Sequence, residues 1–427
     1  MSSPERITLR YFTQFKCVGG SCRENCCTGL KVQLSEENHR RLEERSAKLP
    51  QLKVLFDEMV KLEPEAERSE RRYARIAASG PECPFLDEAR LCHIHMHAGE
   101  DALADPCSLF PRTIAQVGNR LELSATLACP EAARLCLTSE GAVDSVEWAP
   151  GLVAREIVVR SHEVGSADPY VALLDDVRQV CLDVLFLEGL PMVTKLVVLL
   201  ELAVQVEPFF HRGTTTFSGE ALQAAVDGLG GRIEPVQGLV ARTPRSSLKA
   251  VKALAEMLLA RTGACDNVRF NGLVRPMLLK DVAAPKDVVA AYFQGRPEVA
   301  KDPEVLRAVA ERRSELLVRR FGPRVEQFLQ RAAVNSVVKD WYTQQETLAS
   351  SLRRLIVRLA LSRFVLLMDG RFGEETQDAE LDELAVEAFQ IIAKNVEHVP
   401  AFMALCEAYL KEQGLDSVEG AAAMLVV

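Results

Sequence analysis

A chain of 427 residues, 48% of them hydrophobic, can build a core without disulfides, and its length predicts two or three domains. Its net charge is -9, because 60 acidic residues outnumber 51 lysines and arginines, so it lacks the basic surface that nucleic-acid backbones require. Residues 1–12 are polar and charged where a secretory signal is apolar, and no later stretch is long and apolar enough to cross a membrane. We therefore expect a cytoplasmic protein that binds neither nucleic acid nor membrane.

The first third of the chain predicts short elements separated by loops. Ser35 precedes a charged stretch, 36–47, as the cap of a helix, and 51–60 has apolar residues at helical spacing. A loop-like stretch, SGPECPFLDEARLCHIH, follows at 79–95. Residues 119–127, NRLELSATL, alternate polar and apolar side chains after a Val-Gly-Asn turn, which predicts a strand.

The remainder of the chain predicts helix after helix. Apolar residues recur three and four positions apart over 170–188, 191–206, 244–261 and 305–320, and two further helices are expected at 380–394 and 400–413. The clearest stripe, which we expect to be core, consists of Leu352, Leu355, Ile356, Leu359, Phe364 and Leu367.

A boundary between the two regions is predicted near residues 138–152, where glycine, proline and acidic residues interrupt the periodicity. We predict a mainly α fold in two domains. Residues 1–140 form a loop-rich, cysteine-rich, metal-binding domain with short helices and a small β element. Residues 141–427 form an all-α helical domain, the candidate for cofactor and substrate binding.

Cysteines are concentrated in the first domain, where nine of the twelve lie within 136 residues. In a reducing compartment, clustered cysteines more often hold a metal or do redox chemistry than form disulfides. Cys136 sits in a helical-looking run, EAARLCL, and Cys181, Cys265 and Cys406 lie singly in apolar surroundings, so all four are expected to be core. The predicted ligand set is Cys17, Cys22, Cys26, Cys27, Cys83, Cys92, Cys107 and Cys129.

These eight cysteines do not decide which metal is bound. Thiolates favour zinc or an iron–sulfur cluster, and either centre commonly takes four of them. Eight cysteines fit two four-cysteine sites or one site with spare thiols. His93, His95 and His97 alternate as they would on one face of a strand, but we expect them to be surface residues rather than ligands.

Three segments carry a resemblance to a known family: CPFLDEARLC at 83–92, CSLFPR at 107–112 and NRLELSATLACPEAARLCL at 119–137. Together with the cysteine-rich segment 15–29, they resemble the flagellin lysine-N-methylase family, a branch of the CxxxCxxCC group of zinc- or iron-chelating proteins. A weaker likeness extends through VEQFLQRAAVNSVVKDWY at 325–342 and AFQIIAKNVEHVPAFM at 388–403.

The resemblance implies transfer of a methyl group from S-adenosylmethionine to the ε-amine of lysines on flagellin or another protein. It also implies an iron–sulfur cluster on the cysteines, with zinc as the alternative. Glu397 and His398, in the last of these segments, are the candidates for proton handling or for orienting the substrate. Arg112, close to Cys107, is the candidate for holding the cofactor carboxylate or balancing a thiolate centre, with a structural salt bridge as the alternative.

Two further points come from the residues alone. Gly228, Gly230 and Gly231 do not follow a predicted strand, so we expect a plain loop there and no dinucleotide-type fold. Two other functions stay open: a non-catalytic metal-binding or redox-sensing protein that binds a partner, and a related methylase that acts on a peptide or small amine.

Overall fold

The structure is a computed structural model of the chain, and it describes residues 4–28, 32–78, 80, 82–148, 151–153, 155–162, 164–281, 289–290, 292–340 and 345–427. Gly29 of the cysteine-rich segment and the Trp-Tyr end of segment 325–342 lie outside the described residues.

The chain divides into two compact units. Unit 1 contains Met1–Ala132 and Asp144–Ser161, and unit 2 contains Ala133–Val143 and His162–Val427. The sequence predicted one boundary after residue 140, whereas the chain passes between the units three times. The reason is that residues 144–161 return to unit 1 as two further strands of its larger sheet.

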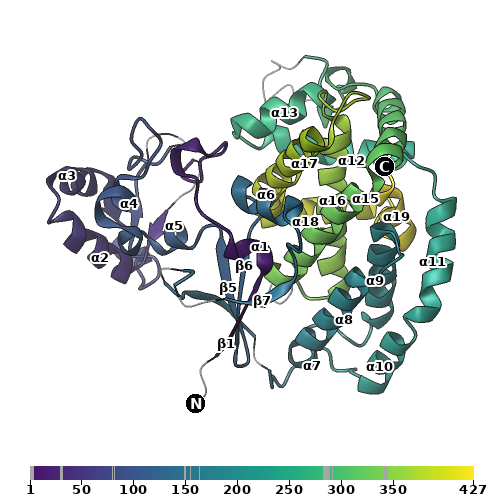
Figure 1. The fold of residues 1–427 in the computed structure, drawn as a ribbon, viewed down its shortest axis with the longest axis horizontal. Helices are drawn as coiled ribbons and strands as arrows, with labels where there is room; N and C mark the ends of the chain where they lie inside the picture. Colours follow the sequence, from purple (N-terminus) through teal and green to yellow (C-terminus); the bar gives the residue numbers. More distant parts are fainter. Residues whose placement is uncertain are drawn as a thin grey trace. The chain divides into compact units, whose positions relative to one another are not determined.

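In the described residues, the larger sheet of unit 1 has five strands in the order β7-β1-β6-β5-β8. Figure 1 labels β1, β5, β6 and β7 of this sheet. Strand β1 runs parallel to β6 and antiparallel to β7, and β5 and β6 form an antiparallel hairpin with Val117 opposite Arg120. Gly118 in the hairpin turn has φ 56°, which favours glycine. The strands are β1 (Glu5–Leu9), β5 (Arg112–Val117), β6 (Arg120–Ala125), β7 (Ser145–Glu147) and β8 (Val158–His162). The strand predicted at 119–127 is confirmed as β6.

The rest of unit 1 packs short helices and a three-stranded sheet around a second, smaller core. The sheet has the order β2-β4-β3, with strands β2 (Gln33–Leu34), β3 (Val60–Leu62) and β4 (Ala74–Ile76). Its core contains Leu34, Leu42, Leu52, Phe56 and Phe85. The helices are α1 (Arg10–Thr13), α2 (Glu36–Ser46), α3 (Pro50–Met59), α4 (His93–Ala98) and α5 (Asp105–Leu109), with one-turn 3-10 helices η1 (Gly19–Ser21), η2 (Glu65–Glu67) and η3 (Glu100–Ala102).

Both predicted N-terminal helices are confirmed as α2 and α3. The Ser35 hydroxyl accepts a hydrogen bond from the Asn38 N–H at 3.1 Å, which satisfies one of the unpaired amides at the start of α2. More β structure is present than the small β element that we expected. The short strands β2, β3 and β4 have only two or three residues each, too few to show an alternating pattern.

Unit 2 is helical. Its helices are α7 (Pro169–Ala172), α8 (Leu174–Phe186), α9 (Met192–Val206), α10 (Gly219–Asp227), α11 (Gly230–Arg242), α12 (Leu248–Gly263), α13 (Val268–Leu278), α15 (Pro303–Asp340), α16 (Leu348–Met368), α17 (Asp378–Ile392), α18 (Pro400–Glu412) and α19 (Val418–Leu425). The described residues of unit 2 also include a 3-10 helix, η4 (Pro297–Val299), and a π-helical turn, η5 (Ala393–Glu397), and α6 (Pro130–Thr138) joins the two units in sequence.

Helix α16 lies at the centre of unit 2 (Figure 1). It contacts α9, α15, α17 and α19. Because it is surrounded, most of its residues are buried, and all six residues of the predicted stripe are at most 3% exposed. The core prediction for this helix is confirmed.

One local prediction was wrong, and the three histidines lie on a helix rather than a strand, although His95 and His97 are exposed as expected. Gly230 and Gly231 open helix α11 rather than forming a loop, although the element before them is helix α10 and not a strand. The histidines of 93–97 lie on helix α4, where His93 and His97 are one turn apart and their rings stack with centroids 5.7 Å apart.

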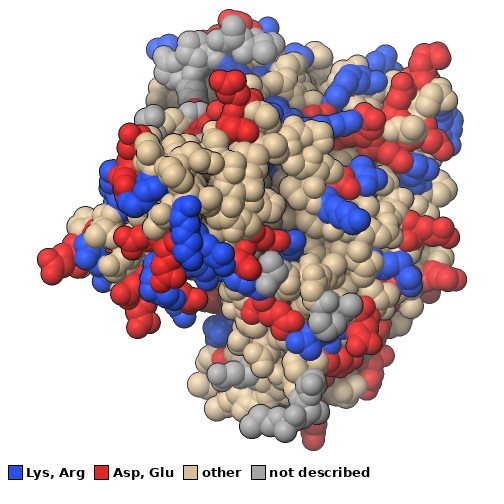
Figure 2. All heavy atoms as spheres, turned by 60° about the vertical axis from the view of Figure 1, so that its left-hand side comes forward, with Lys and Arg blue, Asp and Glu red and all other residues tan. Residues whose placement is uncertain are grey.

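Two further findings concern membrane-spanning helices and the distribution of surface charge. In the described part of the chain, no helix combines the length and apolar composition needed to span a membrane. On the face shown in Figure 2, acidic and basic side chains are interspersed, so neither sign forms a broad uniform patch there.

Candidate functional site

All eight predicted ligands lie in unit 1, and they occupy loops and the starts of helices. Cys17 and Cys26 are exposed, Cys129 is buried, and the other five are half-buried. By contrast, Cys136, Cys181, Cys265 and Cys406 are buried in unit 2, as expected for core residues.

Five of the eight thiols share one neighbourhood, which we call the main thiol group: Cys26, Cys27, Cys83, Cys92 and Cys107. Burial, with a smaller contribution from the nearby thiols of Cys92, Cys83 and Cys26, raises the pKa of Cys107 to about 12. The pKa of Cys27 is raised first by a hydrogen bond with the adjacent Cys26 thiol and then by burial. Thiols affect one another in this way only at short range, because their thiolate forms repel.

Backbone pairing brings the segments of the main thiol group together. The Cys83 N–H donates to the Cys27 carbonyl at 3.1 Å, next to a bridge between Thr28 and Glu82. A second bridge joins Leu86 to Cys92. The group is therefore assembled from residues far apart in sequence by main-chain hydrogen bonds.

A second neighbourhood contains Cys17, Cys22 and Cys129. Burial raises the pKa of Cys129 to about 12, and the thiols of Cys22 and Cys17 add to this shift. The pKa of Cys22 is raised by burial and, more weakly, by Cys17 and by Cys26 of the main thiol group. Cys22 thus lies between the two neighbourhoods.

Backbone amides oppose these shifts at four of the sulfurs. Amides of Glu24 and Phe85 lower the pKa of Cys22 and Cys83, each two residues earlier. Cys92 and Cys129 stand directly before helices α4 and α6, whose first amides lower the pKa of each thiol. Amide hydrogen bonds of this kind stabilise thiolate over thiol and are common around metal-bound sulfur.

The donor set fits a thiolate-bound zinc or iron–sulfur centre by its chemistry. As placed, no three His, Cys, Asp or Glu side chains among the described residues are arranged to hold one metal ion. The fit therefore rests on the soft sulfur donors, their shared neighbourhoods and the amides that favour their ionised form.

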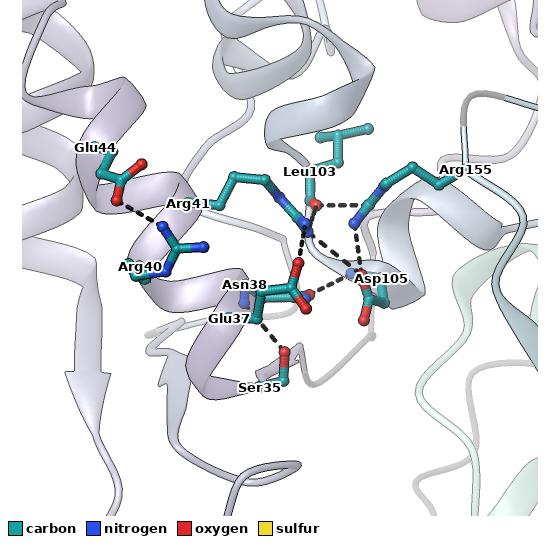
Figure 3. A network of polar contacts seen from close by, with 9 residues as sticks. All are labelled: Ser35, Glu37, Asn38, Arg40, Arg41, Glu44, Leu103, Asp105 and Arg155. Carbon is teal, nitrogen blue, oxygen red and sulfur yellow. Dashed lines mark hydrogen bonds and ion pairs between the residues drawn. The ribbon is translucent and has the colours of Figure 1, made fainter.

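Polar contacts fix the start of helix α5, which carries Cys107 (Figure 3). The Asp105 N–H donates to Asn38 Oδ1 at 2.6 Å, and Arg155 donates to Asp105 Oδ1 at 2.7 Å and to the Leu103 carbonyl at 2.9 Å. Arg155 also acts to lower the pKa of Cys107, against the larger effect of burial.

Arg41 of helix α2 contacts the same two residues. It lies 3.4 Å from Asp105 Oδ1 and 3.5 Å from the Leu103 carbonyl, and its side chain is 19% exposed (Figure 3). Its neighbour Arg40 points elsewhere, pairing with Glu44 at 2.8 Å, and is 63% exposed. Helix α2 therefore supports α5 through one of two adjacent arginines.

Arg112, the predicted cofactor ligand, is the first residue of strand β5. Its guanidinium pairs with Glu100 at 3.1 Å, donates to the Ser108 carbonyl at 2.9 Å and lies 6.0 Å from the Phe15 ring centroid. Its Nε is buried and has no hydrogen-bond partner within the part of the chain that the structure describes. Arg112 thus joins segments of unit 1 and keeps one unsatisfied donor.

Glu397, a predicted catalytic residue, belongs to a buried ring of four charges in unit 2. Its carboxylate lies 2.7 Å from Lys339 Nζ and 3.0 Å from Arg358 Nη1. Asp340 pairs with the same two cations. Burial acts to raise the pKa of Glu397, but Lys339 and Arg358 outweigh it, so the pKa is lowered and the carboxylate stays ionised.

His398, the second predicted catalytic residue, follows at the end of the π-helical turn η5. Its side chain reaches the surface, yet the protein packed around it lowers its pKa by desolvation. Glu397 acts in the opposite direction and does not overcome this effect. The imidazole is therefore mainly neutral at neutral pH.

A cavity of about 620 Å³ in unit 2 was not predicted. Its walls come from α13, α15, α17 and the turn after α16, so its lining residues are spread from 269 to 387. No short motif could have revealed it. The one local signal is Gly272 followed by Pro276 within the helical stretch α13.

The chain has relatives among known proteins. Residues 178–424, more than half of the chain, match the family described as the FliB lysine N-methylase C-terminal domain. A 121-residue stretch is 31% identical to the lysine-N-methylases of Salmonella typhimurium and Salmonella choleraesuis, and it covers 28% of this chain and 29% of each of those proteins. A 122-residue stretch is 31% identical to the flagellar biosynthetic protein FliU of Salmonella muenchen and covers 28% of this chain and 70% of FliU.

No solved structure matches the chain. The matched stretch spans less than a third of the two lysine-N-methylases but more than two thirds of FliU. The family match lies in unit 2 and includes the charge ring and the cavity, whereas the eight cysteines lie outside it. The chain belongs to the FliB lysine N-methylase family.

Proposed function

We propose that this protein transfers a methyl group from S-adenosylmethionine to the ε-amine of lysines on a flagellin-like protein. The observation that carries the proposal is the match of residues 178–424 to a lysine N-methylase family. The names of the relatives, lysine-N-methylase and flagellar biosynthetic protein, support a protein substrate of the flagellum. We place this activity in the cytoplasm, where a reducing environment keeps cysteines available as ligands.

We further propose that the eight cysteines of unit 1 hold an iron–sulfur cluster, with zinc as the alternative. The main thiol group supplies more than the four thiolates that one centre needs, and Cys17, Cys22 and Cys129 form a second ligand group. When bound, such a centre supplies a soft, Lewis-acidic or electron-accepting site and cross-links the loops that carry the cysteines.

Methyl transfer needs a neutral amine aligned with the methyl carbon and the sulfonium. The amine lone pair forms the new N–C bond while the C–S bond breaks and its electrons return to sulfur. With a pKa near 10.4, only about one lysine in two thousand is neutral at pH 7, so a proton must leave first. We propose His398 as the acceptor of that proton, because its lowered pKa keeps it neutral. We propose that Glu397 orients the segment that carries His398.

The test is methyl transfer by anaerobically purified protein. Iron, zinc and acid-labile sulfide are measured first, and the protein is then incubated with methyl-labelled S-adenosylmethionine and flagellin, with a lysine-rich protein of another class as control. We expect label on flagellin lysines. If neither protein nor a small amine gains a methyl group, the enzyme function is wrong and a metal-dependent partner-binding role becomes the better account.

The metal centre is tested separately with two cysteine variants. Burial raises the pKa of both Cys107 and Cys136 to about 12, but only Cys107 belongs to the main thiol group. Cys107→Ser should lose metal and sulfide, whereas Cys136→Ser should retain them. Equal metal content in both variants and the wild type would remove Cys107 from the ligand set.

A further inference from the structure

The cavity in unit 2 has the size of a small-molecule site. Its volume of about 620 Å³ falls within the range typical of ligand pockets. All its lining residues lie inside the stretch 178–424 that matches the family.

Two helices give the cavity an apolar wall. Leu273 and Met277 lie one turn apart on α13, and Val305 and Val309 lie one turn apart on α15, so each pair presents one helix face. Val305 is 55% exposed, which leaves apolar surface for a ligand to cover. A flat apolar group such as a nucleoside base fits this part of the cavity.

Glycine at position 272 widens the cavity. A Cβ built on Gly272 would meet no neighbouring atom within 4 Å, although the residue is helical. Glycine in a helix costs about 1 kcal/mol relative to alanine, so it is not there for helix stability. Its effect is to leave open space at the wall.

The cavity lining also carries both signs of charge, with four basic residues (Arg269, Lys301, Arg313 and Arg371) and two acidic ones (Asp369 and Glu387). Glu387 accepts from Arg269 at 2.7 Å and from Arg371 at 2.6 Å, and Arg371 also pairs with Asp369 at 2.6 Å. Burial acts to raise the pKa of Glu387, but these arginines lower it below its ordinary value. The Glu387 carboxylate therefore stays ionised and holds Arg269 and Arg371 at the cavity.

Arg313 adds a positive charge to the cavity, and only one of its guanidinium nitrogens donates hydrogen bonds among the described residues. Among the described residues, both of its hydrogen bonds leave from Nη1, to the carbonyls of Leu367 at 2.9 Å and Asp369 at 2.7 Å. A guanidinium has five N–H donors, so Nε and Nη2 remain for another acceptor. Burial lowers the pKa of Arg313, and an anionic group beside it would offset that cost.

We propose that this cavity binds the methyl donor, with the amino-acid carboxylate on Arg313 and the adenosyl body against α13 and α15. This assignment rests on the proposed function. The basic lining residues outnumber the acidic ones, so the cavity favours a ligand with an anionic group, and the choice of the methyl donor over a nucleotide comes from the proposed function.

Binding of S-adenosylmethionine, measured by calorimetry on the full chain, tests the assignment. Gly272→Leu fills the cavity with a good helix former, and Gly322→Leu is its matched control, since Gly322 is also helical, also has open space at its Cβ and does not line the cavity. Arg313→Gln removes the carboxylate partner, and exposed Arg312→Gln is its neighbour control.

We expect Gly272→Leu and Arg313→Gln to weaken binding by about tenfold or more, with both controls within about twofold of wild type. If the wild type binds and both cavity variants bind equally well, the donor site is elsewhere and the proposed function stands. If the wild type binds no S-adenosylmethionine, both proposals fail. Stronger binding of adenosine triphosphate than of S-adenosylmethionine, lost in the same two variants, would overturn the choice of ligand.

Discussion

Glu397 illustrates how a residue chosen for chemistry can also hold the fold. Its carboxylate contacts Lys339 and Arg358, which are 5% and 14% exposed, so two cations depend on it inside unit 2. The partners come from α15 and α16, 58 and 39 positions earlier in the chain. No local pattern around residue 397 points to them.

Neutralising Glu397 should destabilise unit 2. Glu397→Gln leaves Lys339 and Arg358 with Asp340 as the remaining carboxylate of the ring, and breaking a buried ion pair typically costs about 3 kcal/mol or more. The measurement is the free energy of unfolding in urea. His398→Gln, an exposed neighbour, should change it by less than about 0.5 kcal/mol. A stable Glu397→Gln protein that has lost only methyl transfer would show that the ring is dispensable for folding and that Glu397 acts in the reaction.

The same carboxylate predicts how stability responds to acid. Because the pKa of Glu397 is lowered from its ordinary value of 4.5, its contribution is complete above that value and is lost as pH falls through the lower folded-state value. Below pH 4.5 the free energy of unfolding should therefore fall more steeply for wild type than for Glu397→Gln. Unfolding curves at a series of pH values measure both slopes, and parallel slopes would contradict the ionised state of Glu397.

At the scale of elements, helix α5 is held in place mainly through its first residue, Asp105. Asn38 and Arg41 reach it from α2, and Arg155 reaches it from a segment 50 residues later (Figure 3). The position of Cys107 thus depends on side chains that do not touch a metal. Supporting residues of this kind often change metal affinity by about 10-fold to 100-fold when they are replaced.

Adjacent arginines on α2 allow a matched test of this support. Arg41→Gln removes contacts to Asp105 and Leu103, whereas Arg40→Gln removes only an exposed pair with Glu44. We expect Arg41→Gln to lose its metal to a chelator about tenfold faster than wild type, and Arg40→Gln to match wild type. Equal loss rates in the two variants would mean that Arg41 does not help to position α5 and that Asn38 and Arg155 suffice.

Elements with a local signal were predictable from the sequence, and those that depend on distant pairing were not. The stripe from Leu352 to Leu367 specifies a buried helix by periodicity alone, and Ser35 specifies the start of α2. Strand β1 is different: its polar–apolar alternation, ERITL, is short, and it pairs with β6 more than 100 residues later. Helix α11 was missed because Gly230, Gly231 and Pro235 are poor helix formers that tertiary packing overrides.

The candidate site was likewise predictable in one part and not in another. Cysteine spacing predicted which thiols to consider, and the structure groups five of them in one neighbourhood and three in another. The cavity could not be predicted, because Gly272, Val305 and Glu387 come from three helices whose packing is decided by the whole of unit 2. Cysteine ligands can be recognised in a sequence by their residue type and spacing, whereas a cavity formed by several helices has no such motif.

At the scale of the whole molecule, the two units differ in what stabilises them. Unit 2 has a continuous helical core around α16, whereas the cysteine-bearing part of unit 1 has short helices, two- and three-residue strands and a small core. Several segments of unit 1 are joined at the cysteines, and there a bound centre would replace apolar contacts that the chain lacks.

Metal removal should therefore loosen unit 1 selectively. After chelation under anaerobic conditions, hydrogen exchange should accelerate in peptides that cover 17–28, 83–92 and 105–109, because their backbone hydrogen bonds are few and near the surface. Peptides from α9 and α16 should exchange as slowly as before, because their amides lie in the helical core of unit 2. Refilling with the native metal should restore protection in the three cysteine segments alone. Uniform acceleration in both units would show that the centre stabilises the whole chain, and no change anywhere would show that the thiols fold without it.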